Sequence, residues 1–263
     1  MRPRRRFGQH FLRPEWVARV VETARPHAED VFLEIGSGRG ALTLALAPRV
    51  ARVVAVEIDR ALAADLAARV PANVVVVAAD ILETDLATLV GPDVPVRAVG
   101  NLPYNISTPI LSRLLAVADD GRRVHDATVM LQREVADRLA ARPGSKAWGV
   151  LSACQQLRAT VSHELVLPPG AFWPVPQVES AVVRLGYHLP RPPVRDAAMF
   201  EALVRSLFTR RRKMLVNALV PFAAARHVEA PEILDATGLD PRRRPETLGL
   251  ADLARLADVF ASG

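Results

Sequence analysis

The sequence has little cysteine, few aromatic residues and almost no lysine, and it has no long apolar run. Its single cysteine, Cys154, cannot form a disulfide within the chain, which excludes a disulfide-stabilised secreted scaffold and predicts a cytoplasmic location. No run reaches the roughly 18 consecutive apolar residues of a membrane-spanning helix, and no apolar segment follows the first charged residues to form a signal peptide. Neither Cys154 nor the six histidines have the spacing of metal ligands, so we expect no metal and no membrane partner.

The composition that is present is typical of a globular protein. Half of the 263 residues are hydrophobic and 24% are charged, which suits one large domain or two unequal ones. Basic residues outnumber acidic ones by 34 to 28, and only Lys146 and Lys213 are lysines. A GC-rich genome explains this excess of arginine, but arginine also binds phosphate bidentately and stacks on bases. The net charge of +6 therefore permits a polyanionic partner without requiring one.

Short runs of β-branched and aliphatic residues alternate with helical patterns through the first two thirds of the chain. Strands are predicted at residues 31–35, 52–56, 74–78, 96–100 and 127–131, and helices at 14–23, 41–47 and 61–70. Continuous apolar strands separated by helices predict an α/β fold with a parallel sheet covered on both faces. Two later runs, 160–166 and 180–187, predict a pair of strands that closes the edge of this sheet.

A proline-rich segment at residues 187–195 marks a change of pattern, because its prolines cannot continue a central strand. Beyond it the apolar residues follow helical spacing, as Phe200, Leu203 and Leu207 illustrate. We therefore predict an α/β domain over residues 1–188 and a small all-α domain over residues 189–263.

The first chemical signal is a glycine-rich turn that follows the first of these predicted strands. Gly36 and Gly38 let the backbone approach a ligand closely, and the helix that begins near Ala41 offers unpaired N–H groups. The second strand is followed by Glu57, whose carboxylate can accept hydrogen bonds from both hydroxyls of a ribose. This pattern nearly fits the G-x-G-x-x-A dinucleotide motif, so by itself it does not separate NAD from S-adenosylmethionine.

The rest of the chain favours a methyl donor over NAD. Asp80 and Ile81 follow the third strand, where an acid can bind the exocyclic amine of an adenine while the isoleucine packs on its face. No histidine, tyrosine–lysine pair or metal site suited to hydride transfer is evident. The sequence therefore favours methyl transfer, and NAD-dependent hydride transfer remains the weaker interpretation.

The segment Asn101-Leu102-Pro103-Tyr104, after the fourth strand, is the most informative motif. The lone pair of an adenine N6 is delocalised into the ring, and two acceptors aimed at its N–H bonds free that lone pair for a methyl donor. The side-chain oxygen of Asn101 and the carbonyl of Leu102 suit this task because Pro103 stiffens the turn that presents them. Tyr104 can stack on the base, which has to leave its helix. Because a sulfonium donor leaves as a neutral thioether, no strong general base is needed.

Several blocks of the sequence resemble the ribosomal RNA adenine N6,N6-dimethyltransferase family, and most closely its bacterial small-subunit members. The matching blocks are residues 7–12, 34–43, 57–59, 101–109, 131–135, 168–178, 180–185 and 208–219. They span nearly the whole chain in order, which makes the match far more specific than the glycine turn alone. The resemblance implies a Rossmann-like class I methyltransferase fold with S-adenosylmethionine as the donor.

The resemblance also implies roles for individual residues. Phe172 would stack on the flipped adenine opposite Tyr104, and Asn101 would contact both donor and target. The residues implied to bind the donor are His10 and Leu12 as a cover, Gly36 and Gly38 at the turn, Glu57 and Ile58 at the ribose, Asp80 and Ile81 at the adenine, and Asn101. The residues implied to be catalytic are Asn101, Leu102, Pro103, Tyr104 and Phe172.

The chain departs from the family at three positions near these residues. Many relatives have asparagine in place of His10, an aliphatic residue in place of Arg39, and a smaller residue in place of Trp173. None of the three lies within residues 101–104, so the implied catalytic segment is intact.

Clusters of basic residues are candidate phosphate contacts. The cluster within a matching block, which is predicted to bind RNA, consists of Arg210, Arg211, Arg212 and Lys213. The tail residues 2–6 and the arginines at 242–244 are further candidates, and solvated surface charge is the competing interpretation for each arginine.

The resemblance implies N6-dimethylation of two adjacent adenosines in the 3′-terminal hairpin of 16S rRNA, within a small-subunit precursor. We expect the enzyme to be a monomer. Two alternatives stay open. A resistance-type methyltransferase of 23S rRNA usually has isoleucine at the position of Leu102, and an RNA-binding assembly factor has no need for Glu57, Asp80 or the segment 101–104.

Overall fold

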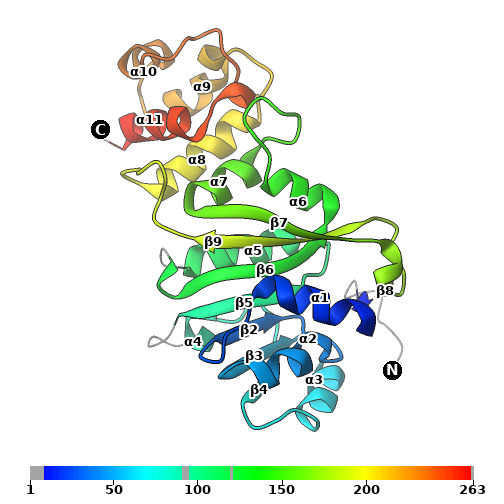
Figure 1. Ribbon diagram of the computed structural model, residues 1–263. Coiled ribbons are helices and arrows are strands. Elements are labelled where there is room, and N and C mark those ends of the chain that lie inside the picture. The colour runs from blue at the N-terminus through cyan, green and yellow to red at the C-terminus, as the bar shows by residue number, and fades with distance from the viewer. Residues whose placement is uncertain (1–8, 91–94, 119–120, 262–263) are drawn as a thin grey trace. The chain divides into compact units, whose positions relative to one another are not determined.

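A computed structural model describes residues 9–90, 95–118 and 121–261 (Figure 1). Contacts divide the chain into two compact units. The first contains Met1–Ala136 and Thr160–His188, and the second contains Asp137–Ala159 and Leu189–Gly263. The basic tail of residues 2–6 lies outside the described residues.

The first unit is built on a seven-stranded mixed sheet (Figure 1). In spatial order its strands are β4 (Val74–Ala78), β3 (Arg52–Glu57), β2 (Val31–Ile35), β5 (Val96–Asn101), β6 (Val124–Gln132), β9 (Ser180–Tyr187) and β7 (Ala159–Leu167). The strands from β4 to β6 are parallel neighbours, whereas β9 runs antiparallel to β6. The predicted α/β class is confirmed, and the later pair β9 and β7 extends the parallel part of the sheet to its edge.

Both faces of this sheet are buried, which explains why its strands are apolar at successive positions. Phe32 and Val53, on one face, share a core with residues of α1 (Pro14–Ala24) and α2 (Ala41–Leu46). Leu33 and Val54 point to the opposite face because side chains alternate along a strand, and they are buried as well. The other helices described in this unit are α3 (Arg60–Ala67), α4 (Leu86–Val90) and α5 (Ser107–Val117).

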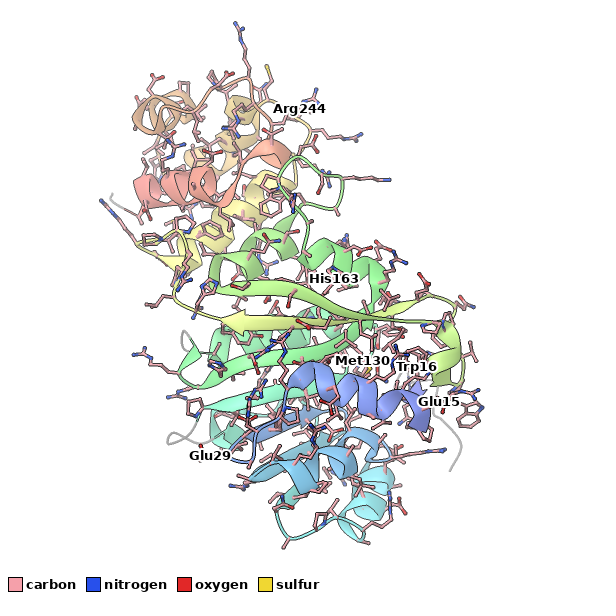
Figure 2. The ribbon with its side chains drawn as sticks, in the orientation of Figure 1. Glu15, Trp16, Glu29, Met130, His163 and Arg244 are labelled. Atoms are coloured by element: carbon pink, nitrogen blue, oxygen red, sulfur yellow. The ribbon has the colours of Figure 1, made fainter. Side chains whose placement is uncertain are left out.

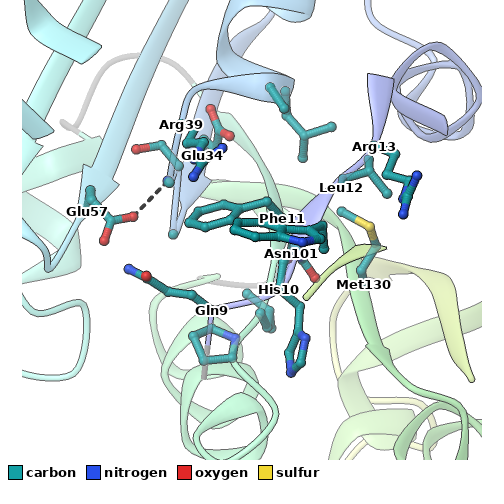
Figure 3. A pocket seen from close by; sticks show the side chains of 18 of the residues that line it. Gln9, His10, Phe11, Leu12, Arg13, Glu34, Arg39, Glu57, Asn101 and Met130 are labelled. Carbon is teal, nitrogen blue, oxygen red and sulfur yellow. Dashed lines mark hydrogen bonds between the residues drawn. The ribbon is translucent and has the colours of Figure 1, made fainter. Parts of the chain in front are cut away.

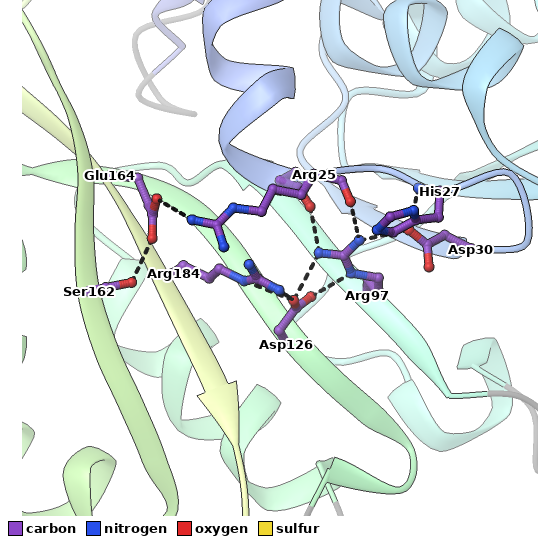
Figure 4. Close-up of polar contacts among 9 residues, drawn as sticks. Arg25, His27, Asp30, Arg97, Asp126, Ser162, Glu164 and Arg184 are labelled. Atoms are coloured by element: carbon purple, nitrogen blue, oxygen red, sulfur yellow. Dashed lines mark hydrogen bonds and ion pairs between the residues drawn. The ribbon is translucent and has the colours of Figure 1, made fainter.

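A buried network of charges joins several parts of the first unit (Figure 4). Asp126 on β6 accepts hydrogen bonds from the Arg97 guanidinium at 2.9 Å and from the Arg184 guanidinium at 3.0 Å. Arg97 also donates to the Asp30 carboxylate at 2.7 Å and to the Arg25 carbonyl at 2.9 Å. The network therefore connects β5, β6 and β9 to the chain that follows α1.

The second unit is all-α, as the apolar spacing predicts. It contains α7 (Val150–Arg158), α8 (Ala197–Phe208), α9 (Leu215–Ala224), α10 (Ala230–Thr237) and α11 (Leu250–Phe260). The stripe of Phe200, Leu203 and Leu207 is buried in its core. In neither unit does any described helix combine the length and apolar character that crossing a bilayer requires.

The structure corrects the predicted domain boundary. The sequence pattern assigns residues 1–188 to the first domain, but Trp148, Ala153 and Leu157 pack in the core of the helical unit. The indole N–H of Trp148 donates to the Leu248 carbonyl at 3.1 Å within that unit. The chain thus leaves the first unit within α6 (Arg133–Leu139) and returns to it in β7. No proline-rich linker marks this excursion, so the composition contains no signal for it.

Candidate active site

A pocket lies at the edge of the sheet where the parallel strands end (Figure 3). Its walls come from the turn after β2, the end of β3, the segment after β5, Met130 on β6 and the N-terminal residues 9–14. The cavity has a volume of about 480 Å³, within the range of small-molecule sites. This position follows from the topology, because open α/β sheets bind ligands beyond the carboxyl ends of their strands.

The glycine-rich turn needs glycine at two of its positions. Gly38 and Gly40 have φ values of +55° and +83°, a region that L side chains rarely adopt. A Cβ atom at Gly40 would lie 2.3 Å from the Leu66 side chain, and one at Gly38 would lie 3.2 Å from the Phe11 ring. Glycine is therefore required here for both conformation and space.

Glu57 is held by backbone amides on both sides of its carboxylate (Figure 3). One oxygen accepts a hydrogen bond from the Gly38 N–H at 2.7 Å, and the other accepts one from the Asp59 N–H at 2.9 Å. Burial raises the pKa of Glu57, while these two amide donors act against that rise. The bonds fix the carboxylate between the glycine turn and the start of α3.

Glu34 is a second pocket carboxyl, and the sequence analysis assigned it no role. It lies near the end of β2, is fully buried, and accepts a hydrogen bond from the Thr43 hydroxyl at 2.5 Å. Burial raises the pKa of Glu34 to about 8, so the group is mainly protonated at neutral pH. An acid inside the apolar run of residues 31–35 was the signal available in the sequence.

The Ser37 hydroxyl is buried in the pocket wall and has no hydrogen-bond partner among the described residues. A buried hydroxyl without a partner is unfavourable by about 1–3 kcal/mol. A polar group of a ligand bound in the pocket would satisfy it.

The segment 101–104, which begins at the last residue of β5, is held by hydrogen bonds beside the glycine turn. Gly100 comes directly before this segment. Glycine is needed there because a Cβ atom would lie 2.4 Å from the Ile35 carbonyl oxygen. The Asn101 amide nitrogen donates to the His10 carbonyl at 2.5 Å, and the Leu102 N–H donates to the Met130 carbonyl at 3.2 Å. These bonds orient the Asn101 side chain and the Leu102 backbone.

Tyr104 presents its ring to the pocket and is fixed at its hydroxyl. That hydroxyl is 2.6 Å from the Ser180 hydroxyl. Burial raises the pKa of Tyr104 above its usual value, so the phenol is neutral at physiological pH. Its ring is stacked on the His10 imidazole, with centroids 5.5 Å apart and planes at 21°.

The N-terminal segment forms a further wall by pairing with a distant strand. The two-residue strands β1 (Phe11–Leu12) and β8 (Phe172–Trp173) are antiparallel, with Phe11 opposite Trp173 and Leu12 opposite Phe172. One nitrogen of the His10 ring is 2.7 Å from the Pro174 carbonyl oxygen. His10 in this segment also contacts Asn101 through its carbonyl and Tyr104 through its ring.

The structure brings most of the predicted site residues to this one pocket. Those that line it are His10, Leu12, Gly36, Gly38, Glu57, Ile58, Asn101, Leu102, Pro103 and Tyr104. Those that do not line it are Asp80, Ile81 and Phe172. The pocket residues that the sequence analysis assigned no role include Phe11, Glu34, Arg39, Met130 and Trp173.

The predicted position of Phe172 is corrected. Its ring is fully buried and packs in a core with Leu12, Val21 and Val182, so it is not available to stack on a base in this structure. The next residue, Trp173, is 46% exposed and lines the pocket. Because neighbouring side chains on a strand point in opposite directions, the sequence does not reveal which of the two faces the cavity.

Asp80 and Ile81 lie in the turn after β4 and are not among the residues that line the pocket. The Asp80 carboxylate accepts a hydrogen bond from the Leu82 N–H at 2.8 Å, and its carbonyl accepts one from the Thr84 hydroxyl at 2.6 Å. Ile81 is buried. Both residues thus shape the turn after β4, outside the pocket wall.

The predicted RNA-binding cluster lies on the second unit. Arg210, Arg212 and Lys213 are exposed, whereas Arg211 forms an ion pair with Glu246 at 2.9 Å. Leu215, two residues after this cluster, is joined to residues 241–243, because its N–H donates a hydrogen bond to the Arg243 carbonyl at 2.7 Å. Arg242 and Arg244 are exposed in the segment that this hydrogen bond joins to the predicted cluster, and Figure 2 labels Arg244.

Comparison with known sequences gives a match over nearly the whole chain. The model of a family described as ribosomal RNA adenine dimethylase matches residues 1–256. The ribosomal RNA small subunit methyltransferase A of Alcanivorax borkumensis is 42% identical over 261 residues, which cover 98% of this chain and 90% of that protein. The protein of the same name from Chromobacterium violaceum is also 42% identical, with coverage of 97% and 95%.

Solved structures give a consistent comparison. The 23S rRNA methyltransferase ErmE is 28% identical with a TM-score of 0.69, and the match covers 95% of this chain and 99% of that one. A dimethyladenosine transferase from Plasmodium falciparum has a TM-score of 0.81 at 22% identity, with coverage of 96% and 98%. At 22% identity, the similarity to the Plasmodium falciparum structure shows a shared fold.

Proposed function

Because the chain belongs to the ribosomal RNA adenine dimethylase family, we propose that its pocket uses S-adenosylmethionine to dimethylate N6 of two adjacent adenosines in the 3′-terminal hairpin of small-subunit rRNA. The chain is thus a methyltransferase. The relatives that are 42% identical are named for the small ribosomal subunit, which favours that substrate over the large subunit.

A single observation carries this proposal. The glycine turn after β2 and the segment 101–104 after β5 line the same cavity. One wall suits a nucleoside-containing donor and the other suits an adenine amine. Methyl transfer requires that donor and acceptor share one enclosed space with their reacting atoms close together.

The donor wall fits S-adenosylmethionine by its chemistry. When bound, this donor supplies an electrophilic methyl group on a sulfonium sulfur. The Glu57 carboxylate, fixed by the Gly38 and Asp59 amides, is the group for the ribose hydroxyls. The unpartnered Ser37 hydroxyl is the group for a further polar atom of the donor. No metal is required for this chemistry.

The acceptor wall activates the adenine amine. The Asn101 amide nitrogen is already engaged by the His10 carbonyl, which directs the side-chain oxygen to serve as the acceptor. In the first transfer, that oxygen and the Leu102 carbonyl would accept hydrogen bonds from the two N6–H groups, so that the nitrogen lone pair is released from the ring. In the second transfer, one N6–H remains for them to hold. In each transfer a C–N bond would form as the C–S bond of the donor breaks, and one N6 proton would pass to water.

Tyr104 provides the stacking surface for the target base. Stacking on an aromatic ring is worth about 1–3 kcal/mol per base. That amount is similar to the few kcal/mol needed to extrude a base from its stack. Exposed Arg210, Arg212 and Lys213 on the second unit are proposed phosphate contacts for the surrounding RNA.

The experiment is methyl transfer from labelled donor to small and large ribosomal subunits that lack these methyl groups. We expect label in small-subunit RNA, at two adjacent adenosines, and a loss of at least about 100-fold in kcat for Asn101→Ala. Label mainly in large-subunit RNA would overturn the substrate assignment. Undiminished transfer by Asn101→Ala would remove Asn101 from the mechanism.

A further inference from the structure

Three side chains from separate parts of the first unit meet at the pocket. The guanidinium of Arg39 lies over the Phe11 ring, 4.5 Å from its centroid, and over the Trp173 ring, 5.5 Å from its centroid. The backbone positions of Phe11 and Trp173 are paired across β1 and β8. All three residues line the cavity.

The exposure of Trp173 calls for an explanation. At 46% exposure it is the only tryptophan, tyrosine or phenylalanine of the exposed class within residues 9–90, 95–118 and 121–261. An indole left half in water at the rim of a cavity forgoes much of the stabilisation that burial would give it. Its neighbour Phe172 is fully buried, so this exposure belongs to Trp173 alone and not to the strand.

The cluster is separate from the wall that contacts the target amine. His10 and Phe11 are consecutive, and in the view of Figure 3 the His10 ring and Arg39 lie on opposite sides of Phe11. The His10 ring stacks on Tyr104, whereas the Phe11 ring contacts Arg39. The stacked pair of His10 and Tyr104 and the contact of Arg39 with Phe11 are therefore two separate groups of side chains in the pocket.

Resting on the proposed function, we infer that Phe11, Arg39 and Trp173 form a subsite for the nucleotide next to the target adenosine. The Trp173 indole stacks on its unpaired base, and the Arg39 guanidinium binds its phosphate. Aromatic rings stack on any base, and arginine combines a planar surface with a fork that fits phosphate. The Phe11 ring packs against Gly38, and the Arg39 guanidinium lies over the face of this ring.

The subsite joins two residues, Arg39 and Trp173, that are far apart in the sequence. In the structure they contact each other. A cation beside an exposed aromatic ring suits a single-stranded nucleotide, which brings one phosphate and one π-face.

The test measures RNA binding and donor binding separately on the full chain. The RNA probe is a hairpin with two adjacent adenosines in its loop, one of them replaced by 2-aminopurine. Its affinity is measured by fluorescence anisotropy over a range of salt concentrations, and donor affinity is measured by calorimetry. The variants are Trp173→Ala, Trp173→Phe, Arg39→Ala and Arg39→Lys. The matched control is Arg19→Ala, because Arg19 lies over the Trp16 ring at 4.7 Å and neither residue lines the pocket.

We expect Trp173→Ala to weaken RNA binding about tenfold and to relieve the quenching of 2-aminopurine. Trp173→Phe should lower the RNA affinity by less than about threefold. Arg39→Ala should reduce the slope of log affinity against log salt by about 0.7, the value of one single-stranded phosphate contact, and Arg39→Lys should retain it. Donor affinity should fall less than RNA affinity in Trp173→Ala and Arg39→Ala, although both residues line the pocket, and Arg19→Ala should bind RNA as the wild type does.

Three results would overturn the subsite. RNA affinity unchanged in Trp173→Ala would remove the stacking role, with the wild-type methylation assay still supporting the proposed function. A fall in donor affinity equal to the fall in RNA affinity would place the indole in the donor site. A wild-type chain that does not bind the hairpin would overturn the subsite, whereas the methylation assay on ribosomal subunits decides the proposed function separately.

Discussion

Two pocket carboxyl groups illustrate how surroundings decide the state of a side chain. Both oxygens of Glu57 accept hydrogen bonds from backbone amides, which stabilise its charged form. Glu34 lies deeper, with the Thr43 hydroxyl as its hydrogen-bond donor, and its pKa is raised to about 8. The same chemical group therefore acts as a hydrogen-bond acceptor at Glu57 and as a protonated acid at Glu34.

The raised pKa of Glu34 makes the stability of the protein depend on pH. Between pH 4.5 and about 8 the folded state holds a proton that the unfolded state has released. The stabilisation is complete below pH 4.5 and is lost as the pH rises toward 8. We expect wild-type stability, relative to Glu34→Gln, to fall by about 1 kcal/mol per pH unit across this window.

This prediction is checked by urea denaturation at several pH values. Glu22→Gln is the matched control because Glu22 is an exposed acid paired with Arg49 at 2.7 Å, and its curve should parallel that of the wild type. If the free energy of unfolding depended on pH in the same way for the wild type and Glu34→Gln, Glu34 would be ionised in the folded state and the prediction would be wrong.

Short strands fix the walls of the pocket. The pair β1 and β8 contains only two residues from each strand, yet it decides that Leu12 and Phe172 enter the core. The same pair directs Phe11 and Trp173 into the pocket. The pocket therefore depends on a contact between residues that are about 160 positions apart in the sequence.

We expect Phe172→Ala to lower the free energy of unfolding by about 3–5 kcal/mol, because it leaves a cavity in a packed core. Trp173→Ala is the adjacent control and should cost less than about 1 kcal/mol, because that ring is half exposed. Denaturant titration of both variants measures this difference. A Phe172→Ala variant of wild-type stability that has lost turnover would restore the stacking role that the family resemblance implies.

The network around Asp126 connects three strands and the chain after α1 (Figure 4). Removing its central carboxylate leaves the buried Arg97 without its main partner. We expect Asp126→Asn to lower the free energy of unfolding by about 3–5 kcal/mol. The control is Glu201→Gln, which breaks an exposed ion pair with Arg205 and should cost less than about 1 kcal/mol. If thermal or chemical denaturation showed equal losses of unfolding free energy for Asp126→Asn and Glu201→Gln, the buried network would contribute no more than an exposed ion pair.

At the level of the complete chain, the excess of positive charge belongs to the second unit, which has 16 basic and 10 acidic residues, whereas the first unit has 18 of each. Arg210, Arg212 and Lys213 are exposed on the second unit, and Arg39 lines the pocket of the first. The long-range attraction of such charges for a polyanion depends on salt, whereas base stacking depends on it little. RNA affinity therefore has a part that salt weakens and a part that it leaves intact.

We expect Arg210→Ala and Lys213→Ala each to weaken RNA binding and to reduce its salt dependence by about one ion released. Arg211→Ala should change the salt dependence less, because Arg211 is paired with Glu246. Arg205→Ala, which removes an exposed arginine paired with Glu201, is the control. The measurement is RNA affinity as a function of salt, and identical slopes in all four variants would contradict RNA contact by the cluster.

The sequence by itself determined the α/β class, the positions of the strands, and the segments that bring the glycine turn, Glu57 and residues 101–104 to one edge. These features follow from local patterns, because apolar runs, glycine turns and strand ends each occupy a few consecutive residues. The parallel topology then places the carboxyl ends of the strands side by side.

Only the tertiary structure decided two other features. It assigned residues 137–159 to the helical unit, and it buried Phe172 while exposing Trp173. Each depends on which distant residue a side chain meets. A two-residue strand has too short a pattern to show its buried face, so the pairing of β1 with β8 had to supply that information.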